Sequence, residues 1–330
     1  MCGIPQSMDS ALRLCSEQLY EFNKKEWIFQ FFKEKLLNLS EINKIKRLSI
    51  VAMVQDDELL ETLVLKGGNA LDIIYNISSR GSMDLDFSIE HEFKPGEISS
   101  VRDRIFDALK KVFNEHGYTV FDIDFFEKPS SNDPKIPDFW GGYGIEFKII
   151  PTAQYAAMAD NVENLRRNAT VVGSGQQKKF IIDISKFEYC EQKKQVEVDN
   201  YAVYVYSPEM IVFEKLRAIC QQMEEYTKIF GKSHISGRAR DFFDIYTVLE
   251  HFSISLTSPN QLELLKKVFA AKRVPLKLLG CIPKYRELHK SDFPSVESTV
   301  RKGVKLNSFD YYFDYVVDKS SCLLKALGIK

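Results

Sequence analysis

Apolar and charged positions alternate at helical spacing over residues 8–60, for example at Leu12, Cys15, Leu19 and Phe22. Apolar residues three or four positions apart form one face of a helix. The pattern therefore predicts a helical N-terminal section over residues 1–60.

The pattern changes near residue 63, where a short apolar run meets Lys66-Gly67-Gly68. Residues 69–77 then read as a helix that the chain enters through the two glycines. Residues 82–89 alternate polar with apolar side chains, which is typical of a strand with one buried face. The same reasoning predicts an amphipathic helix over 99–117 and further strands over 119–126, 144–150, 179–184 and 201–206.

From residue 207 onward, helical spacing dominates. Ser207-Pro208-Glu209 begins a helix that is predicted to run to about residue 226, because Pro is favoured in the first helical turn. Further helices are expected over 237–250, 259–271 and 308–327. The sequence thus predicts an α+β fold, with a mixed sheet and flanking helices over 61–206 and a helical C-terminal domain over 207–330. Strand order is not readable from the sequence.

Composition excludes several classes of protein. The longest apolar runs, such as those over 63–65 and 180–182, are far shorter than the roughly 20 residues that a membrane span requires. The N-terminus lacks the basic start and apolar run of an export signal, so we expect a cytoplasmic protein with no membrane partner. Lys and Arg total 45 against 46 Asp and Glu. A nucleic-acid partner would therefore have to be held by a local basic patch.

Asp84 and Asp86 are separated by one residue on the strand predicted over residues 82–89. Because side chains alternate along a strand, both carboxylates share one face while Leu85 and Phe87 face the core. Two carboxylates about 7 Å apart along a strand suit hard cations such as Mg²⁺. A pair of such ions activates an attacking hydroxyl and neutralises a departing pyrophosphate. Two solvated acids on an exposed strand face are the alternative.

A second acidic pair, Asp122 and Asp124, has the same spacing on another predicted strand. Sequence context separates the two pairs. Asp84 and Asp86 follow the glycines and a helix start, where free backbone N–H groups and the helix dipole attract phosphate. The second pair follows an ordinary amphipathic helix, so we interpret it as structural.

Two cations and a third carboxylate are further candidates. Lys66 and Arg80 bracket the helix that follows the glycines, where each either places positive charge beside a triphosphate or is a plain surface residue. Enzymes of this chemistry often take a third carboxylate from a neighbouring strand. Glu146, on the strand predicted over 144–150, is our candidate for this metal ligand, with Asp183 as its competitor.

The helical half carries a second group of charged residues. Lys215 lies on the helix that begins near Ser207, and we expect its ammonium in solvent or against phosphate. Downstream, Asp241 and Asp244 share one face of a helix because they are three residues apart. Arg238 precedes them. Arginine and aspartate so closely interleaved also fit a plain surface ion pair.

Four ordered stretches together resemble the AbiEii-type nucleotidyltransferase toxins of bacterial type IV toxin–antitoxin and phage-abortive systems. They are Lys66-Gly67-Gly68-Asn69-Ala70-Leu71, Arg80-Gly81-Ser82-Met83-Asp84-Leu85-Asp86, Glu214-Lys215-Leu216-Arg217-Ala218 and Arg238-Ala239-Arg240-Asp241-Phe242-Phe243-Asp244. The stretches span about residues 65–249, which is over half of the chain. Their fixed order is far more specific than any one of them.

The resemblance implies a nucleotidyltransferase-like core and assigns roles to these residues. Gly67 and Gly68 would approach the nucleotide phosphates, and Asp84 and Asp86 would bind Mg²⁺ or Mn²⁺. The remaining roles are triphosphate contact by Lys215, catalysis by Asp241, phosphate binding by Arg80 and Arg238, and nucleotide binding by Lys66 and Ser82. The chain departs from the family at Arg240, where the family usually has Lys, a change that keeps the charge but alters hydrogen-bond geometry.

The expected reaction is transfer of NMP from an NTP to an acceptor hydroxyl, with release of pyrophosphate. By analogy with the family, the acceptor is the 3′ end of tRNA and the protein has a cognate antitoxin. Two alternatives stay open at this point. One is a nucleotide-binding regulatory module without turnover, and the other is a nucleotidyltransferase that modifies a small molecule or a protein.

Overall fold

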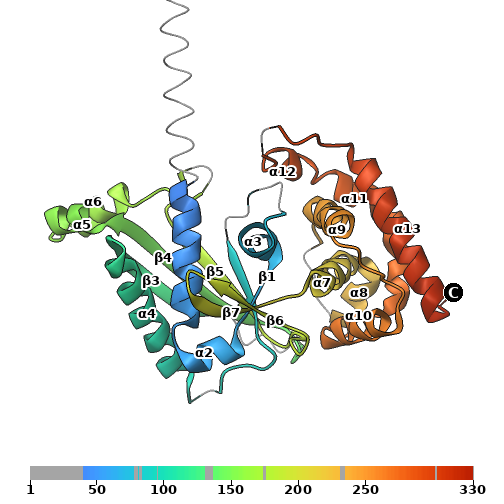
Figure 1. Ribbon diagram of the computed structural model, residues 1–330, viewed down its shortest axis with the longest axis horizontal. Helices are drawn as coiled ribbons and strands as arrows, with labels where there is room; N and C mark the ends of the chain where they lie inside the picture. Colours follow the sequence, from blue (N-terminus) through green and yellow to red (C-terminus); the bar gives the residue numbers. More distant parts are fainter. Residues whose placement is uncertain are drawn as a thin grey trace, which may run out of the picture. The chain divides into compact units, whose positions relative to one another are not determined.

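The computed structural model describes residues 40–77, 81, 84–94, 96–130, 137–173, 176–230, 235–301 and 303–329. The chain divides into two compact units, Met1–Arg47 and Leu48–Lys330. In the first unit, residues 40–47 are helical. The second unit contains the β-sheet and the C-terminal helices (Figure 1).

Seven strands form one mixed sheet in the order β3-β4-β5-β2-β1-β7-β6. They are β1 (Val64–Lys66), β2 (Leu85–Ser88), β3 (Tyr118–Lys128), β4 (Gly142–Pro151), β5 (Phe180–Ser185), β6 (Lys194–Val198) and β7 (Tyr201–Val205). Strands β1 and β7 pair in parallel, as do β2 and β5, and the other pairs are antiparallel. The sheet confirms the predicted α+β class, and it adds β6, a mostly exposed strand that the sequence pattern did not indicate.

Short helices and one long helix accompany the strands. They are α2 (Asp57–Thr62), α3 (Gly67–Asn69), the π-helical turn η1 (Ala70–Ile74), α4 (Ile98–Glu115), α5 (Thr152–Met158) and α6 (Val162–Asn168). Helix α4 lies along β3, and its buried stripe contains Val101, Ile105 and Leu109. Phe113 of the same helix meets Phe147 of β4 edge to face, with ring centroids 5.8 Å apart. Burial of this apolar stripe fixes the β3–β4 side of the sheet.

The C-terminal half is helical, as predicted. It comprises α7 (Pro208–Cys220), α8 (Glu224–Phe230), α9 (Ala239–His251), α10 (Pro259–Ala271), the 3-10 helix η3 (Leu276–Tyr285), α11 (Arg286–Lys290), α12 (Pro294–Glu297) and α13 (Phe309–Leu327). Ser207 caps α7 by accepting a hydrogen bond from the Met210 N–H at 3.3 Å. Ser308 caps α13 in the same way. These side chains satisfy backbone donors that a helix start leaves free.

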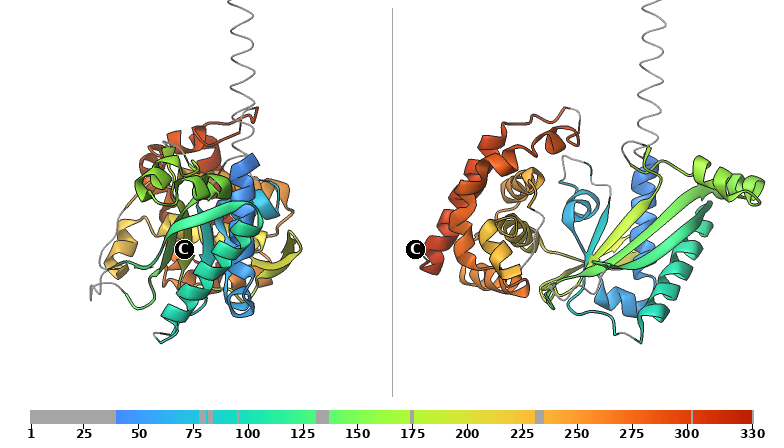
Figure 2. Two further views of the ribbon diagram at one scale, coloured as in Figure 1. Left: turned by 90° about the vertical axis from the view of Figure 1, so that its left-hand side faces the viewer. Right: turned by 180° about the vertical axis from the view of Figure 1, so that it is seen from behind.

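Helix α7 is buried along almost its whole length because α9 and α10 both pack against it. Helix α9 is held in turn by Phe242, whose ring stacks on Phe313 of α13 at 5.1 Å. Figure 1 and the right-hand view of Figure 2 show these helices grouped together beside the sheet. This packing fixes the positions of the charged residues on α7 and α9. No helix in the part of the chain that the structure describes is long and apolar enough to cross a membrane.

Candidate active site

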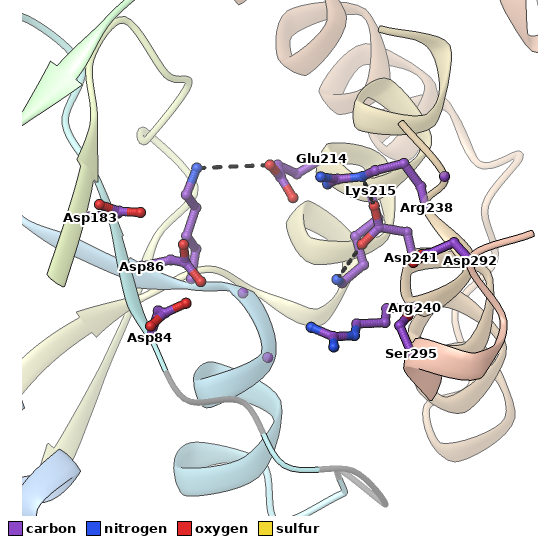
Figure 3. Close-up of a pocket in the computed structure, with 14 residues that line it drawn as sticks. Asp84, Asp86, Asp183, Glu214, Lys215, Arg238, Arg240, Asp241, Asp292 and Ser295 are labelled. Carbon is purple, nitrogen blue, oxygen red and sulfur yellow. Dashed lines mark hydrogen bonds and ion pairs between the residues drawn. The ribbon is translucent and has the colours of Figure 1, made fainter. Parts of the chain in front are cut away.

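A cleft of about 580 Å³ lies between the sheet and the helical half. Its walls are formed by Lys66, Gly67, Gly68, Asp84, Asp86, Asp183, Glu214, Lys215, Gly237, Arg238, Arg240, Asp241, Asp292 and Ser295. Figure 3 shows three carboxylates on the sheet side facing lysine and arginine side chains from the helices. The cleft therefore brings together parts of all four stretches on which the resemblance rests.

Three neighbouring strands place a row of charged side chains across one face of the sheet. Lys66 of β1 pairs with Asp86 of β2, and Asp86 pairs with Asp183 of β5. Residues paired in register point to the same face of a sheet. Asp84 is two positions before Asp86 and belongs to the same face. The carboxylates of Asp86 and Asp183 thus lie side by side on adjacent strands, and Asp84 lies two residues before Asp86.

The turn after β1 requires glycine at its first position. Gly67 has a φ of +71°, and a Cβ atom there would lie 2.6 Å from Asp86 Oδ2. The backbone of α3 therefore approaches the carboxylate more closely than a side chain would allow. Asn69 ties the same segment to β2 by donating a hydrogen bond from Nδ2 to the Asp84 carbonyl at 2.6 Å. The first N–H groups of a helix lack intrahelical acceptors, so this turn offers donors beside the carboxylates.

Asp86 is a carboxylate on the sheet side of the cleft, and its pKa is perturbed. Its pKa is raised to about 6, mainly by burial; Lys66 and Lys215 lower the pKa, and the neighbouring charges of Asp183 and Glu214 add to the rise. A carboxylate held among other carboxylates favours a bound cation because the cation relieves both repulsion and desolvation. The donor set at Asp84, Asp86 and Asp183 therefore suits a hard divalent ion.

Lys66 belongs to a buried charge network behind the carboxylates. Its Nζ lies 3.7 Å from Glu188 and 3.8 Å from Glu214. Burial lowers the pKa of Lys66, but attraction to these carboxylates outweighs that effect and the pKa is raised. Glu188 also forms an ion pair with Arg217, with 2.6 Å between Arg217 Nη1 and Glu188 Oε2. Lys66 is therefore charged, lines the cleft, and connects β1 to α7.

Lys215 does not lie in solvent, which was one of the two placements expected from the sequence, although it does line the cleft. Its side chain is buried, and its Nζ pairs with Asp241 at 2.9 Å and Asp244 at 2.8 Å. Helix α7 is covered on all sides, so no face of it is a plain solvated surface. The shared face of Asp241 and Asp244 was predicted correctly, and it serves to hold this one ammonium.

Two arginines at the start of α9 also line the cleft. Arg238 pairs with Asp241 through Nε at 2.6 Å, and that aspartate raises the pKa of Arg238. Asp241 is buried, but the attraction of Arg238 and Lys215 outweighs burial and lowers the pKa of its carboxyl well below the usual range. Arg240 is exposed and its side chain extends toward the glycine turn (Figure 3). The sequence identified Arg240 only as a departure from the family pattern.

Glu146 does not reach the cleft. It lies on the same sheet face as Asp183, but β5 stands between β4 and β2, and Glu146 pairs opposite Ile181 rather than beside Asp86. Its carboxylate is held 2.5 Å from Lys179. Asp183, the competitor in the sequence interpretation, takes the place beside Asp86. Arg80 and Ser82, two other predicted nucleotide-binding residues, lie outside the described residues.

The second acidic pair occupies a different setting. Asp122 has a φ of +49°, and the β3–β4 register shifts between Phe121 and Asp124. The Asp122 carboxylate accepts from Lys148 and from Arg166, each at 2.7 Å. The hydrogen bond from Arg166 is the main reason why the pKa of Asp122 is lowered to about 2. Asp122 is thus held by cations of its own and does not line the cleft.

No three of the His, Cys, Asp and Glu side chains among the described residues close around a single point in a way that would hold a metal ion. Mg²⁺ is commonly held by one or two carboxylates together with water and substrate phosphates rather than by a cage of protein ligands. The row formed by Asp84, Asp86 and Asp183 fits that mode of binding. The ligand set would be completed by a nucleotide.

A family model described as "Nucleotidyl transferase AbiEii toxin, Type IV TA system" matches residues 50–313. The match covers most of the chain and all four stretches. The chain belongs to the AbiEii nucleotidyl transferase toxin family. It is therefore a nucleotidyltransferase of a toxin–antitoxin type.

Three solved structures are similar to the chain at low identity. A candidate nucleotidyltransferase from H. pylori has a TM-score of 0.45 and 16% identity, with 87% of this chain and 95% of that chain covered. JHP933 from Helicobacter pylori has a TM-score of 0.43 and 16% identity, covering 86% and 91%. An antigenic nucleotidyltransferase-like protein from Paracoccidioides brasiliensis has a TM-score of 0.33 and 15% identity, covering 74% and 93%. No curated protein is similar enough to the chain to count as a match.

Proposed function

We propose that the cleft transfers NMP from an NTP to an acceptor hydroxyl with the help of Mg²⁺ or Mn²⁺, and that the acceptor is the 3′ end of tRNA. The observation that carries this proposal is the pairing of Asp86 with Asp183 on adjacent strands, beside the turn at Gly67. Cations from α7 and α9 face this row from across the cleft.

The charge of the cleft supports metal dependence. Four cations line it, Lys66, Lys215, Arg238 and Arg240, against six carboxylates, Asp84, Asp86, Asp183, Glu214, Asp241 and Asp292. A wall with this excess of negative charge repels a triphosphate unless further cations accompany the nucleotide. Asp84, Asp86 and Asp183 would hold these ions, which when bound supply neutralisation of the phosphates and activation of the attacking hydroxyl.

The reaction forms one bond and breaks one bond. The acceptor oxygen attacks the α-phosphorus, the bond from the α-phosphorus to the bridging oxygen of the β-phosphate breaks, and the hydroxyl proton passes to water. Pyrophosphate leaves with the bond electrons. Because the attacking and leaving oxygens lie roughly in line, the protein contributes mainly position and electrostatic stabilisation.

Each remaining side chain has a role that follows from its place. Gly67 and Gly68 let the α3 backbone reach the phosphates, with Lys66 behind them. Arg240 extends from α9 toward the same turn and binds the terminal phosphates together with Arg238. Asp241 orients Arg238 and Lys215 through its ion pairs. We thus assign Lys215 and Asp241 to positioning within the triphosphate site.

The proposal also covers organisation and partners. The sheet region over 61–206 supplies the carboxylates and the glycines, while the helical region over 207–330 supplies cations and completes the site. A cognate antitoxin accompanies toxins of this family, and NTP and tRNA are both found in the cytoplasm, where we expect the protein to act.

Incubation of the purified protein with each α-labelled NTP, Mg²⁺ and total cellular RNA tests the proposal. We expect label in tRNA and release of pyrophosphate in equal amounts. Tight NTP binding without pyrophosphate release would instead indicate a regulatory module. Label that appears only in protein or in a small molecule would leave the nucleotidyltransferase in place and overturn the tRNA assignment.

A further inference from the structure

A second cavity, of about 500 Å³, adjoins the cleft on its β4–β5 side. The two cavities share four lining residues, Lys66, Asp183, Glu214 and Arg238. The other residues that line the second cavity do not line the cleft, among them Lys128, Trp140 and Gln222, which follows α7. Asp183 therefore stands at the boundary, with one cavity on each side of it.

Strand order gives the two cavities different places in the reaction. Across the sheet the order is β1, β2, β5 and then β4. The glycine turn follows β1, so the phosphates that leave as pyrophosphate lie at the β1 end of the row in the proposed function. Attack in line with the leaving group must come from the opposite side of the α-phosphate. That side faces β5 and β4, where the second cavity lies.

The charge of the second cavity differs in sign from that of the cleft. Five cations line it, Lys66, Lys128, Arg217, Arg238 and Lys272, against three carboxylates, Asp183, Glu188 and Glu214. An excess of cations attracts an anionic acceptor and disfavours a polycationic one such as an aminoglycoside.

Lys128 and Trp140 have geometries that suit the end of a nucleic acid. Gly144 leaves space for the ring of Phe126 and for the Lys128 side chain, because Phe126 Cζ and Lys128 Cε would lie 2.5 and 2.8 Å from a Cβ at that position. Lys128 Nζ forms an ion pair with Asp183. Trp140 is half-buried, and the ammonium of Lys272 lies 5.3 Å from its ring centroid. An aromatic wall beside lysines provides stacking for a base and positive charge for a phosphate.

We propose that this second cavity is the acceptor subsite and that it binds the 3′ end of a single-stranded nucleic acid, with a base against Trp140 and a phosphate at Lys128. The inference rests on the proposed function, because it uses the direction of attack. It adds the location of the acceptor, in the cavity lined by Lys128 and Trp140.

Direct binding measurements test the subsite. The probe is a fluorescein-labelled single-stranded oligoribonucleotide of about ten nucleotides. Its binding to the protein is measured by fluorescence anisotropy in the absence of NTP. Trp140→Ala and Lys128→Ala should each weaken its binding by about tenfold or more, the usual size of one lost stacking or phosphate contact. Tyr311→Ala and Lys179→Ala are matched controls, since Tyr311 is 47% exposed and Lys179 is paired with Glu146 outside both cavities.

NTP binding, measured by calorimetry with Mg²⁺, separates the possible failures. Trp140→Ala should leave it unchanged. If Trp140→Ala weakened NTP binding and left oligonucleotide binding intact, the cavity would hold the NTP base and the inference would be wrong.

A wild-type protein that binds NTP but no oligonucleotide would also overturn the subsite while the proposed nucleotidyl transfer stands. Failure to bind NTP at all would instead refute the proposed function. Lys128→Ala changes a half-exposed side chain, so it provides the test even if the Trp140 variant does not fold.

Discussion

Asp86 and Asp183 lie directly opposite each other on the paired parallel strands β2 and β5. Replacement of Asp183 by Asn should therefore reduce nucleotidyl transfer by about 100-fold or more, because one oxygen ligand of the ions loses its charge. The rate of label transfer from NTP measures the effect. Glu146→Gln is the matched control, since Glu146 lies on the same sheet face but pairs with Lys179. Activity lost in Glu146→Gln and kept in Asp183→Asn would reverse the assignment of the third carboxylate.

Gly67→Ala should lower both activity and stability. The new methyl group would lie 2.6 Å from Asp86 Oδ2, and the residue would have to keep a φ of +71°. A non-glycine residue in that backbone region costs about 1 kcal/mol or more, and displacement of the carboxylate would raise KM for NTP. Gly96→Ala provides the control because a Cβ there meets nothing within 4 Å. Equal unfolding midpoints and equal KM values for the two variants would contradict this account of the turn.

Lys215→Met should destabilise the fold as well as abolish transfer. The change leaves the buried carboxylates of Asp241 and Asp244 without their shared cation. Removal of one partner from a buried ion pair costs about 3 to 5 kcal/mol, which denaturant titration would detect. Arg240→Ala, at an exposed position of the same cleft, should raise KM for NTP with no change in the unfolding midpoint. A Lys215→Met protein as stable as the wild type would show that this ion pair is dispensable for folding.

The contribution of His289 to stability should fall with decreasing pH between 6.5 and about 4, while Asp86, whose pKa is raised to about 6, contributes in the opposite direction over much of the same range. Burial lowers the pKa of His289 from 6.5 to about 4, so in this window the unfolded chain binds a proton that the folded protein does not. Its Nδ1 accepts a hydrogen bond from the Arg238 N–H at 3.2 Å, an arrangement that protonation would break. The loss should reach up to roughly 3 kcal/mol at the acid end.

Unfolding free energies of wild type and His289→Phe across this pH range check that expectation. The variant should be less stable at pH 7, because the Arg238 N–H loses its acceptor. The stability difference between wild type and variant should shrink as the pH falls from 6.5 to about 4, because only the wild type loses the His289 contribution. The pKa of Glu188 is lowered to about 2, and the pKa of Asp241 is also lowered. Their contributions to the pH dependence of stability therefore fall mainly at lower pH than that of His289. An unchanged slope in His289→Phe would exclude this histidine as the source.

The contrast between Glu146 and Asp183 shows how far the sequence could lead. Alternation along each strand places both carboxylates on the same face, and both lie on strands that the pattern predicted. Their distance from Asp86 depends on strand order, which arises from long-range pairing and leaves no local signal. The order puts β5 next to β2 and β4 one strand further away, and this alone decides between the two residues.

Lys215 illustrates a second limit. Its position on a helix after Ser207 was correctly predicted, as was the shared face of Asp241 and Asp244. Helical spacing shows which residues share a face, but it does not show that α9 and α10 cover α7 on both sides. The partners of Lys215 are 26 and 29 residues away in the sequence. Burial of the lysine therefore became visible only with the tertiary packing.

Metal-dependent nucleotidyl transfer at Asp84 and Asp86 can be measured as pyrophosphate release from NTP in the presence of RNA. It should be measured for wild type, Asp84→Ala, Asp86→Ala and Asp124→Ala, with Mg²⁺ and with a chelator. Asp124, exposed on β3, is the control from the second acidic pair. We predict release by wild type and Asp124→Ala with Mg²⁺, none with the chelator, and a loss of about 100-fold or more in the Asp84 and Asp86 variants. Full release by Asp86→Ala, or release that continues in the chelator, would contradict the account.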